Sequence, residues 1–285
     1  MQWHLQQGAS HLIAAEPVNA FAQERKTESE EVLQDNAQVS LAPATDLISH
    51  APSSLIQSPI QAQSDEGALG SAAAKVEAER LAGACQSLEE LREAIAGFEG
   101  LSIKKTATNM VFSDGNPEAD VMVIGEAPGA DEDRLGKPFV GLSGELLDKI
   151  LASIGLDRGA ENPKDSVYIS NILNWRPPGN RTPSPMEIDI SLAFIQKHIM
   201  LAKPKVLLFC GGVSAKALLG RSEGISRLRN QVHLCDISLS TNPEGVVGPI
   251  SGIATYHPAY LLRSPAQKKL VWADMLLLKD VLGKI

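Results

Sequence analysis

The sequence predicts an α/β fold in which a mainly parallel sheet is covered by helices on both faces. From about residue 75 to the C-terminus, short apolar runs with the length of strands alternate with longer helical patterns. A parallel pair of strands needs a long crossover connection, which is usually a helix, so this alternation is typical of a parallel sheet. The chain has 285 residues and is 44% hydrophobic, which is enough to bury one sizeable core.

The expected elements follow one another along the chain without an internal repeat. Ser87 is placed to cap a short amphipathic helix, and Glu90 completes a capping box three residues later. Strands are expected at residues 120–124, 166–173, 205–210 and 252–256. Further helices are expected at residues 144–154, 185–201, 214–219 and 265–282.

Residues 1–74 differ from the rest of the chain in composition. They are rich in Ala, Gln, Ser, Glu and Pro, and they show no sustained helical or strand period. Nine acidic and two basic side chains lie there, which leaves 25 acidic and 24 basic side chains in residues 75–285. A segment with so few apolar residues cannot offset its ordering entropy. We therefore expect a disordered acidic extension over residues 1–74 and one folded, nearly neutral domain over residues 75–285.

The sequence carries no pattern typical of a membrane span, a secretory signal or a cysteine metal site. No apolar stretch reaches 18 residues, and the first residues lack a basic region followed by an apolar core. A cytoplasmic location is therefore expected. Cys85, Cys210 and Cys235 form no C-x-x-C pair, and Cys210 lies in an apolar run as a small buried residue does.

The first candidate site follows the strand expected at residues 120–124. The sequence there is Gly125-Glu126-Ala127-Pro128-Gly129, and loops after such strands carry the chemistry of many α/β proteins. Its glycine spacing fits neither the dinucleotide-binding fingerprint nor the P-loop. Glu126 on this tight turn is either a carboxylate that orients a water molecule or an ordinary solvated acid. The three acids that include Glu132 are either functional or a solvated first turn of a helix.

Two later loops carry side chains suited to a planar ligand that is linked to phosphates. Phe139 lies two residues before Gly141, where it either stacks on such a ligand or packs in the core. Asn171 ends a strand, and its amide either reads one edge of a nucleobase or caps a turn. Prolines between Arg176 and Arg181 fix a rigid loop, and the two arginines are suited to contact phosphates.

His257 ends the last expected strand, and Pro258 holds it on a stiff loop. A single histidine is more often structural than catalytic. The following Leu261, Leu262 and Arg263 combine exposed apolar residues with a cation, as does a wedge that enters a DNA groove. We therefore treat this segment as the last candidate site.

Three long segments of the chain, taken together and in order, carry a resemblance. They are GEAPGADEDRLGKPFVGLSGELLDKIL, YISNILNWRPPGNRTPSPME and HPAYLLRSP. They resemble the signature blocks of the uracil-DNA glycosylase superfamily, and specifically of its family 4 from bacteria and archaea. The resemblance extends from about Thr106 to the C-terminus. It implies a three-layer α/β/α sandwich around a central four-stranded, mainly parallel sheet, with a DNA-binding groove across the strand ends.

The resemblance also implies an activity in base excision repair, in which uracil is flipped out of DNA and its N-glycosidic bond is hydrolysed to leave an abasic site. The residues implied to bind uracil are Ala127, Phe139 and Asn171. His257 is implied to stabilise the charge that develops on uracil O2. Those implied to position water or support the cationic sugar are Glu126, Glu132 and Asn180. Those implied to contact DNA are Arg176, Arg181, Pro258, Leu262 and Arg263.

The chain departs from family 4 at the four cysteines that hold a 4Fe-4S cluster in typical members. Alignment of KTATN and NWRPPGNR places Phe98, Leu101, Trp175 and Ser191 at those positions. None of them supplies the thiolate that such clusters require. We therefore expect a variant with no cofactor and no bound metal, in which apolar packing by Phe98, Leu101 and Trp175 replaces the structural link of the cluster.

Other functions remain open at this point. A module that binds uracil or damaged DNA but hydrolyses poorly has the same fold, since a fold does not fix an activity, although Glu126, Asn171 and His257 together argue against it. A nucleotide-dependent enzyme is disfavoured by the phosphate-loop spacings. We expect uracil-containing DNA as the substrate, a monomer, no membrane contact and work on a bacterial nucleoid. The N-terminal extension either binds a repair or replication protein or only keeps the chain soluble.

Overall fold

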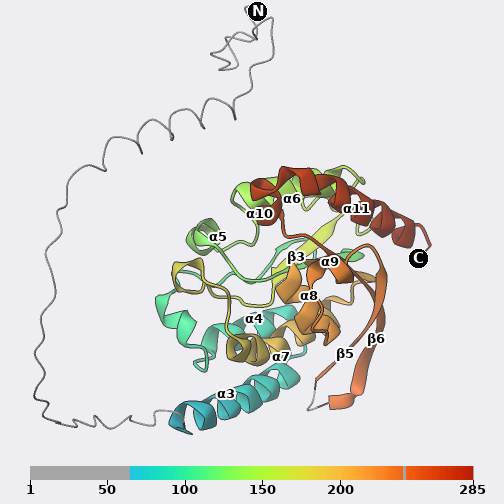
Figure 1. The fold of residues 1–285 in the computed structure, drawn as a ribbon. Helices are drawn as coiled ribbons and strands as arrows, with labels where there is room; N and C mark the ends of the chain where they lie inside the picture. Colours follow the sequence, from blue (N-terminus) through green and yellow to red (C-terminus); the bar gives the residue numbers. More distant parts are fainter. Residues whose placement is uncertain (1–64, 240–241, 285) are drawn as a thin grey trace, which may run out of the picture. The chain divides into compact units, whose positions relative to one another are not determined.

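A computed structural model of the protein describes residues 65–239 and 242–284. Its centre is a six-stranded sheet with the strand order β1-β3-β2-β4-β6-β5 (Figure 1). The strands are β1 (Asp114–Gly115), β2 (Val121–Gly125), β3 (Val167–Asn171), β4 (Val206–Cys210), β5 (Val232–Leu239) and β6 (Asn242–Thr255). The four inner strands pair in parallel, whereas β1 and β5 are antiparallel edge strands. The predicted α/β class and parallel sheet are confirmed, and two edge strands extend the expected four strands to six.

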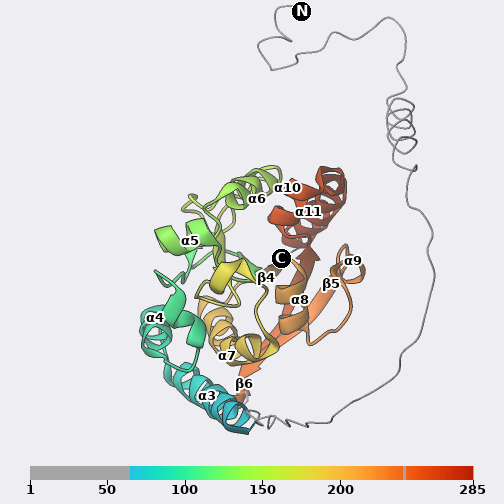
Figure 2. The ribbon, with the colours of Figure 1, turned by 60° about the vertical axis from the view of Figure 1, so that its left-hand side comes forward.

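Helices cover both faces of the sheet. Side chains alternate between the faces along each strand. Met122 and Ile124 of β2 therefore belong to one core cluster, and Val121 and Val123 belong to the other. The first cluster is closed by α3 (Asp65–Ala84), α4 (Leu88–Gly97), α7 (Pro185–Ala202) and α8 (Gly212–Leu219). The second is closed by α6 (Leu142–Ala152), α10 (Pro258–Arg263) and α11 (Lys268–Leu282), which lie together in both views (Figures 1 and 2).

The remaining elements are short and lie in the connections. They are the helices α5 (Ala130–Leu135) and α9 (Ile225–Leu228) and the 3-10 turns η1 (Ser102–Thr106), η2 (Pro178–Asn180) and η3 (Pro265–Gln267). Within residues 65–239 and 242–284, no helix is both long and apolar enough to cross a membrane.

Capping residues set the starts of two helices that cover the sheet. The Oγ atom of Ser184 accepts a hydrogen bond from the Glu187 amide at 3.3 Å, and the Glu187 carboxylate accepts one from the Ser184 amide at 2.7 Å, which is a capping box at the start of α7. Ser87 caps α4 as predicted, since its Oγ accepts from the Glu90 amide at 3.1 Å. The predicted capping box is wrong there, because the Glu90 carboxylate accepts from the Gln86 amide instead.

The predicted domain boundary at residue 75 falls inside α3, so the folded domain also includes residues 65–74. This helix packs on α7 and buries Ala78 and Ala82 completely. Small alanine side chains do not mark the buried face of a helix as large apolar residues do, so the pattern was not visible in the sequence. Residues 1–64 lie outside the described residues, and the disorder expected for them stays a prediction.

Candidate active site

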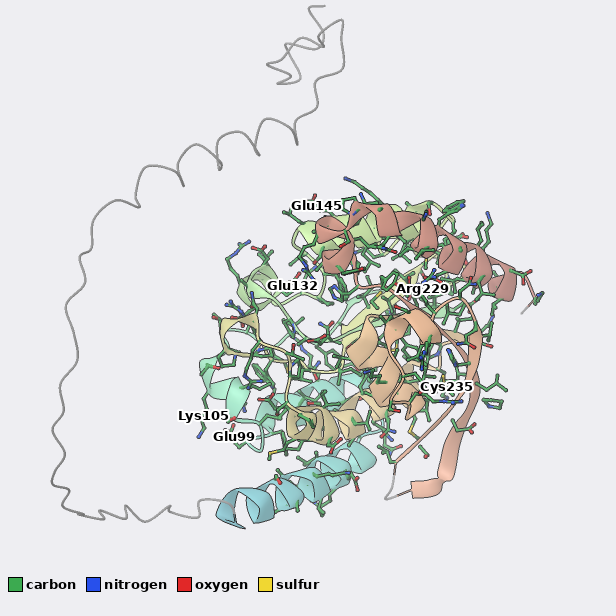
Figure 3. The ribbon with its side chains drawn as sticks, in the orientation of Figure 1. Glu99, Lys105, Glu132, Glu145, Arg229 and Cys235 are labelled. Carbon is green, nitrogen blue, oxygen red and sulfur yellow. The ribbon has the colours of Figure 1, made fainter. Side chains whose placement is uncertain are left out.

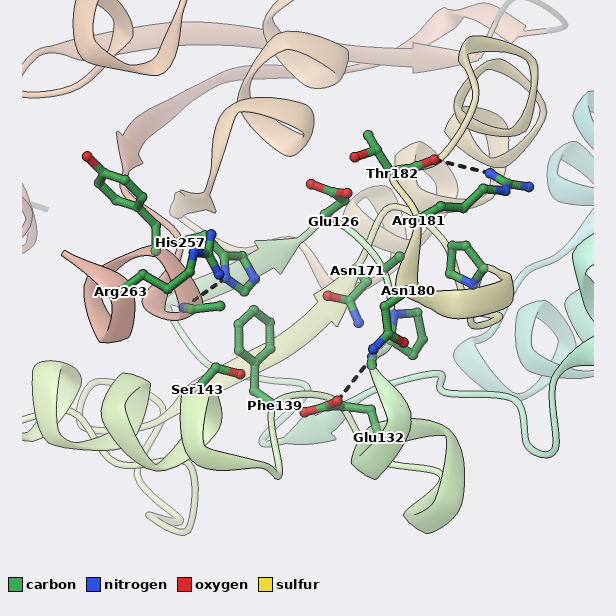
Figure 4. A pocket seen from close by; sticks show the side chains of 16 residues that line it. Glu126, Glu132, Phe139, Ser143, Asn171, Asn180, Arg181, Thr182, His257 and Arg263 are labelled. Atoms are coloured by element: carbon green, nitrogen blue, oxygen red, sulfur yellow. Dashed lines mark hydrogen bonds between the residues drawn. The ribbon is translucent and has the colours of Figure 1, made fainter. Parts of the chain in front are cut away.

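The inner parallel strands end at the same edge of the sheet, where their loops surround one cavity. Gly125 at the end of β2 is in register with Asn171 at the end of β3, and His257 follows β6 by two residues. The cavity has a volume of about 470 Å³ (Figure 4). The residues that line it are Glu126, Ala127, Pro128, Gly129, Glu132, Phe139, Ser143, Asn171, Pro177, Asn180, Arg181, Thr182, His257, Ala259, Tyr260 and Arg263.

The cavity brings together most of the residues that were singled out in the sequence. Those that line it are Glu126, Ala127, Glu132, Phe139, Asn171, Asn180, Arg181, His257 and Arg263. Those that lie outside its lining are Arg176, Pro258 and Leu262.

Phe139 forms one wall of the cavity. Its ring stacks beside the His257 ring, with 5.5 Å between the ring centroids and 26° between the planes. The residue is 5% exposed, and its backbone φ is +51°, a left-handed conformation that is uncommon for a bulky residue. The ring of Phe139 therefore faces the cavity from a backbone that must be held in place by its surroundings.

Asn171 and Phe139 meet at Gly125. A Cβ atom at Gly125 would lie 2.3 Å from Asn171 Oδ1 and 2.6 Å from Phe139 Cζ, so only glycine allows both side chains to approach the backbone this closely. Asn171 is 3% exposed, and its side-chain amide has no hydrogen-bond partner among the described residues. Among those residues, every fully buried side-chain polar atom except Ser191 Oγ has a hydrogen-bond partner. Because the Asn171 amide has no partner, its atoms are not fully buried. The amide is therefore accessible from the cavity and free to pair with a ligand.

His257 caps the N-terminus of α10. Its Nδ1 atom accepts a hydrogen bond from the Ala259 amide at 3.1 Å (Figure 4). Burial lowers the pKa of His257 to about 4; the nearby Glu132 carboxylate opposes this shift, and the Arg263 cation adds to it. At neutral pH the ring is therefore uncharged, and because Nδ1 is an acceptor, Nε2 carries the proton. The ring can donate one hydrogen bond from Nε2 to a ligand.

Glu126 is half-buried beside the same space as Phe139, Asn171 and His257 (Figure 4). No described residue donates a hydrogen bond to its carboxylate, and burial raises its pKa above the ordinary value. Such a carboxylate is free to accept a proton from a water molecule in the cavity. The interpretation of Glu126 as an ordinary solvated acid does not fit this position.

Glu132 lies in the first turn of α5 (Figure 3) and is buried. Its Oε2 atom accepts from the Gly129 amide at 3.0 Å, and its Oε1 atom accepts from the Val140 and Gly141 amides at 3.0 and 3.2 Å. Both carboxylate oxygens are thus engaged by backbone amides. This geometry supports the positioning of two loops at the cavity and not the activation of water, so the expected catalytic role of Glu132 does not fit its contacts.

The rigid loop after β3 carries Arg176, Asn180 and Arg181 as predicted, but each of them has a partner within the protein. Arg176 donates from Nε to Asn180 Oδ1 at 2.7 Å. The Arg181 guanidinium makes two hydrogen bonds to Glu187, at 2.8 and 2.6 Å, and its side chain is still 46% exposed. Arg263 has no hydrogen-bond or ion-pair partner among the described residues, and it is the least constrained cation at the cavity.

The segment after His257 is a short helix and not the stiff loop expected from the sequence. Pro258 is buried at the first helical position of α10, where proline is favoured, which leaves it little surface for a DNA contact. Leu261 is fully buried in the core, which corrects its expected exposure. Leu262 is 45% exposed beside Arg263, as a wedge residue must be.

The four positions aligned with cluster cysteines are filled by a packed core. Phe98, Leu101 and Trp175 are buried, and the ring of Phe98 makes an edge contact with Phe194 at 5.2 Å between centroids. Ser191 is buried, with its Oγ unpaired. Apolar groups and one hydroxyl do not match the thiolates that an iron–sulfur cluster needs, so these residues do not fit a cluster.

A cation links two of these segments. Lys104 Nζ donates to the carbonyls of Ala96 and Phe98 at 2.6 and 3.2 Å, and it lies 5.8 Å from the centroid of the Trp175 ring. It therefore ties the end of α4 to the segment that follows β3. No group of three histidine, cysteine or acidic side chains in the described part of the chain could hold a metal ion.

Several residues of the cavity carried no signal in the sequence. Ser143 opens α6 without a recognisable motif, and Thr182 and Tyr260 lie within predicted segments but were not singled out. The sequence shows Gly125 only as the start of a loop. The need for glycine there comes from the close approach of Phe139 and Asn171, which are distant from it in sequence.

Comparisons with known proteins place the chain in a family. The family model for the uracil DNA glycosylase superfamily matches residues 112–276. The chain is 35% identical over 188 residues to the type-4 uracil-DNA glycosylase of Pyrobaculum aerophilum, which covers 63% of this chain and 86% of that protein. It is 33% identical over 203 residues to the type-4 uracil-DNA glycosylase of Archaeoglobus fulgidus, and this match covers 70% of this chain and 95% of that protein. A type-5 uracil-DNA glycosylase of Thermus thermophilus is 32% identical over 114 residues, and this match covers 37% of this chain and 52% of that protein. The chain belongs to the uracil DNA glycosylase superfamily.

Proposed function

We propose that the protein is a uracil-DNA glycosylase that hydrolyses the N-glycosidic bond of uracil in DNA and leaves an abasic site. One observation carries the proposal: an aromatic ring, a free amide and a neutral imidazole donor face a single cavity at the strand ends. The type-4 enzymes of Pyrobaculum aerophilum and Archaeoglobus fulgidus support it by their similarity over most of their length.

The first step is recognition of a uracil that has been flipped out of the helix. Phe139, which lines the cavity, stacks on the flat face of the base. The Asn171 amide is able to donate to uracil O4 and to accept from N3–H, so it reads the edge that distinguishes uracil from cytosine. The buried position of Asn171 makes this selective, because a base that cannot pair leaves the amide unsatisfied.

The second step is cleavage of the bond between C1′ of the sugar and N1 of uracil. The electron pair of this bond moves into the base, and negative charge develops on uracil O2. The proton on His257 Nε2 stabilises that charge by a hydrogen bond. A neutral imidazole needs no reorganisation for this role, since the Ala259 amide already fixes its tautomer.

The third step is attack by water on C1′ of the sugar. The Glu126 carboxylate, which has no partner among the described residues, orients the water and accepts its proton. The water oxygen forms the new bond to C1′, and uracil leaves as an anion that solvent protonates. Leu262, which lies outside the cavity, and Arg263, which lines it, are the exposed groups suited to fill the gap in the duplex and to contact phosphate.

The proposal includes catalysis without an iron–sulfur cluster. Phe98, Leu101, Trp175 and Ser191 offer no thiolate, and Lys104 joins two of the segments. Purified protein should therefore contain no stoichiometric iron or acid-labile sulfide. Stoichiometric iron that stays with the protein through gel filtration would contradict this part of the proposal.

The activity is tested with end-labelled oligonucleotides that carry one uracil in single-stranded, U·G and U·A contexts, followed by alkaline cleavage of abasic sites. The matched control oligonucleotide carries thymine at the same position. Cleavage at uracil alone supports the proposal. Tight binding of the uracil oligonucleotides without cleavage would instead identify a damage-binding module.

A further inference from the structure

Arg158 lies outside the cavity, in the connection between α6 and β3, yet it contacts the backbone that carries Phe139. Its NH1 atom donates to the Pro138 carbonyl at 3.2 Å, and its NH2 atom donates to the Phe139 carbonyl at 3.0 Å. The Arg158 side chain is only 17% exposed. No sequence motif marks Arg158, and no step of the proposed uracil excision uses it.

The Phe139 carbonyl is closely packed and therefore needs a hydrogen-bond donor in a fixed position. A Cβ atom at Gly144 would lie 1.9 Å from this carbonyl oxygen, so the first turn of α6 presses directly against it. The residue also has the left-handed φ of +51°. A strained backbone of this kind persists only where its surroundings determine it, and a buried carbonyl needs a donor. Arg158 supplies that donor.

The same short segment is held from its other side by a negative charge. The Val140 and Gly141 amides donate to Glu132 Oε1, while the carbonyls of Pro138 and Phe139 accept from Arg158. The donors of the segment thus meet a carboxylate, and its acceptors meet a guanidinium. Charge-assisted hydrogen bonds on both sides fix the direction in which the Phe139 ring leaves the backbone.

Two carboxylates hold the guanidinium in turn. Arg158 Nε donates to Asp148 Oδ1 of α6 at 2.8 Å, and NH1 lies 3.2 Å from Asp114 Oδ2 of β1. Lys137 is a second cation on Asp114, at 3.3 Å from Oδ1, but its side chain is 61% exposed, and no hydrogen bond joins it to the Phe139 segment. Lys137 therefore offers a matched control for the loss of a cation at this position.

We propose that Arg158 is a positioning residue for the base-stacking wall: its guanidinium grips the Pro138 and Phe139 carbonyls and so holds the Phe139 ring in the orientation that a flipped uracil meets. The proposal rests on the proposed function for its catalytic consequence, because Arg158 acts only through Phe139. The planar, two-pronged guanidinium is essential to this role, since a lysine ammonium cannot reach both carbonyls with the same geometry.

Hydrogen exchange of the peptide that covers residues 137–142 tests the grip without any use of activity. We expect Arg158→Met and Arg158→Lys to raise its exchange rate about tenfold or more, because the bonds from Val140 and Gly141 to Glu132 open more often. Lys137→Met should leave the exchange unchanged. Unchanged exchange in both Arg158 variants would overturn the proposal. Arg158→Lys retains the charge beside Asp114 and Asp148, so it also covers the case in which Arg158→Met fails to fold.

Single-turnover excision tests the consequence for the reaction. A displaced stacking ring should slow uracil release about 10²-fold in Arg158→Lys, with little change in the affinity for abasic DNA. In a Phe139→Ala background the same substitution should have no further effect. Equal slowing in both backgrounds would mean that Arg158 does not act through Phe139. If the unmodified protein released no uracil, the proposed function would fail, while the exchange result would still decide whether Arg158 holds the segment.

Discussion

At the scale of single residues, the site depends on two side chains whose protonation states are set by burial. His257 is neutral because burial lowers its pKa to about 4, and Glu126 has a raised pKa because it is half-buried without a partner among the described residues. In the proposed reaction His257 keeps its Nε2 proton, and Glu126 is ionised so that it can accept a proton from water. The two requirements are met together at neutral pH and begin to fail as the pH falls.

The excision rate should therefore fall on the acid side as Glu126 gains a proton, starting at a higher pH than an exposed carboxylate would give. Glu126→Gln should be slower by about 10²–10⁴-fold at neutral pH and should lack this acid limb. Glu145→Gln is the matched control, since Glu145 is exposed on α6 and does not line the cavity. Single-turnover rates across the acid range measure both effects. An acid limb that persists in Glu126→Gln would assign it to another group.

The sequence singles out Glu126, Asn171 and His257 because they lie at or just after strand ends, and Phe139 because the three blocks carry a specific resemblance. Phe139 itself lies between α5 and α6 and not after a strand. The sequence could not separate the roles of these residues from that of Glu132. The Glu132 carboxylate is satisfied by the amides of Gly129, Val140 and Gly141, and backbone amides carry no signature in a sequence. Arg158 carries no signal in the sequence either, because the partners that tie it to the Phe139 segment are backbone carbonyls.

At the scale of elements, the inner strands could be predicted because buried parallel strands are continuous apolar runs. The edge strand β5 could not be predicted in this way, because it is only partly buried and leaves Val232 and Leu234 exposed at the edge of the sheet. The sequence does not reveal helix α10, since six residues are too few to show a helical period. His257 both caps this helix and lines the cavity.

The close contact between α6 and the Phe139 carbonyl predicts that a side chain at position 144 destabilises the protein. Gly144→Ala would place a Cβ atom 1.9 Å from the Phe139 carbonyl oxygen and 2.1 Å from its carbon, so helix or loop must move. We expect a loss of about 1–3 kcal/mol in the free energy of unfolding, together with slower excision. Urea unfolding measures the first effect.

The control for this prediction is Gly97→Ala. A Cβ atom at Gly97 would have no neighbour within 4 Å, so stability should change by less than about 0.5 kcal/mol. Equal stability of Gly144→Ala and Gly97→Ala would show that the close approach of α6 to the Phe139 carbonyl is not required.

At the scale of the whole molecule, buried His198 and partly buried His257 link folding to pH. Burial lowers the pKa of His198 to about 3 and that of His257 to about 4, from an ordinary value of 6.5. The unfolded chain therefore binds more protons than the folded one below about pH 6.5, and stability falls as the pH decreases from there through the folded pKa values.

The free energy of unfolding should accordingly decrease between about pH 6.5 and about pH 4, with a slope of up to about 1.4 kcal/mol per pH unit for each histidine. His198 stacks on Phe112 and bonds to the Tyr168 hydroxyl at 2.8 Å, so His198→Gln should lower the slope as well as the stability. Urea titrations at several pH values give the slope. A slope that His198→Gln leaves unchanged would contradict the assignment.

The position of α3 defines where the chain can be shortened. Deletion of residues 1–64 should leave the excision rate and the melting temperature of the domain unchanged. Deletion of residues 1–74 should lower the melting temperature, because it shortens a helix that buries Ala78 and Ala82 against α7. Equal melting temperatures for the two truncated proteins would show that the first half of α3 does not contribute to the fold.

The most direct test of the account is the single-turnover rate of uracil excision by iron-free protein in the presence of EDTA, compared with His257→Ala. The matched control is His233→Ala, since His233 is partly buried on β5 and does not line the cavity. We predict that iron-free protein and His233→Ala excise uracil at the same rate, and that His257→Ala is slower by about 10²–10³-fold. Excision that requires added iron, or that proceeds equally well without the His257 imidazole, would contradict it.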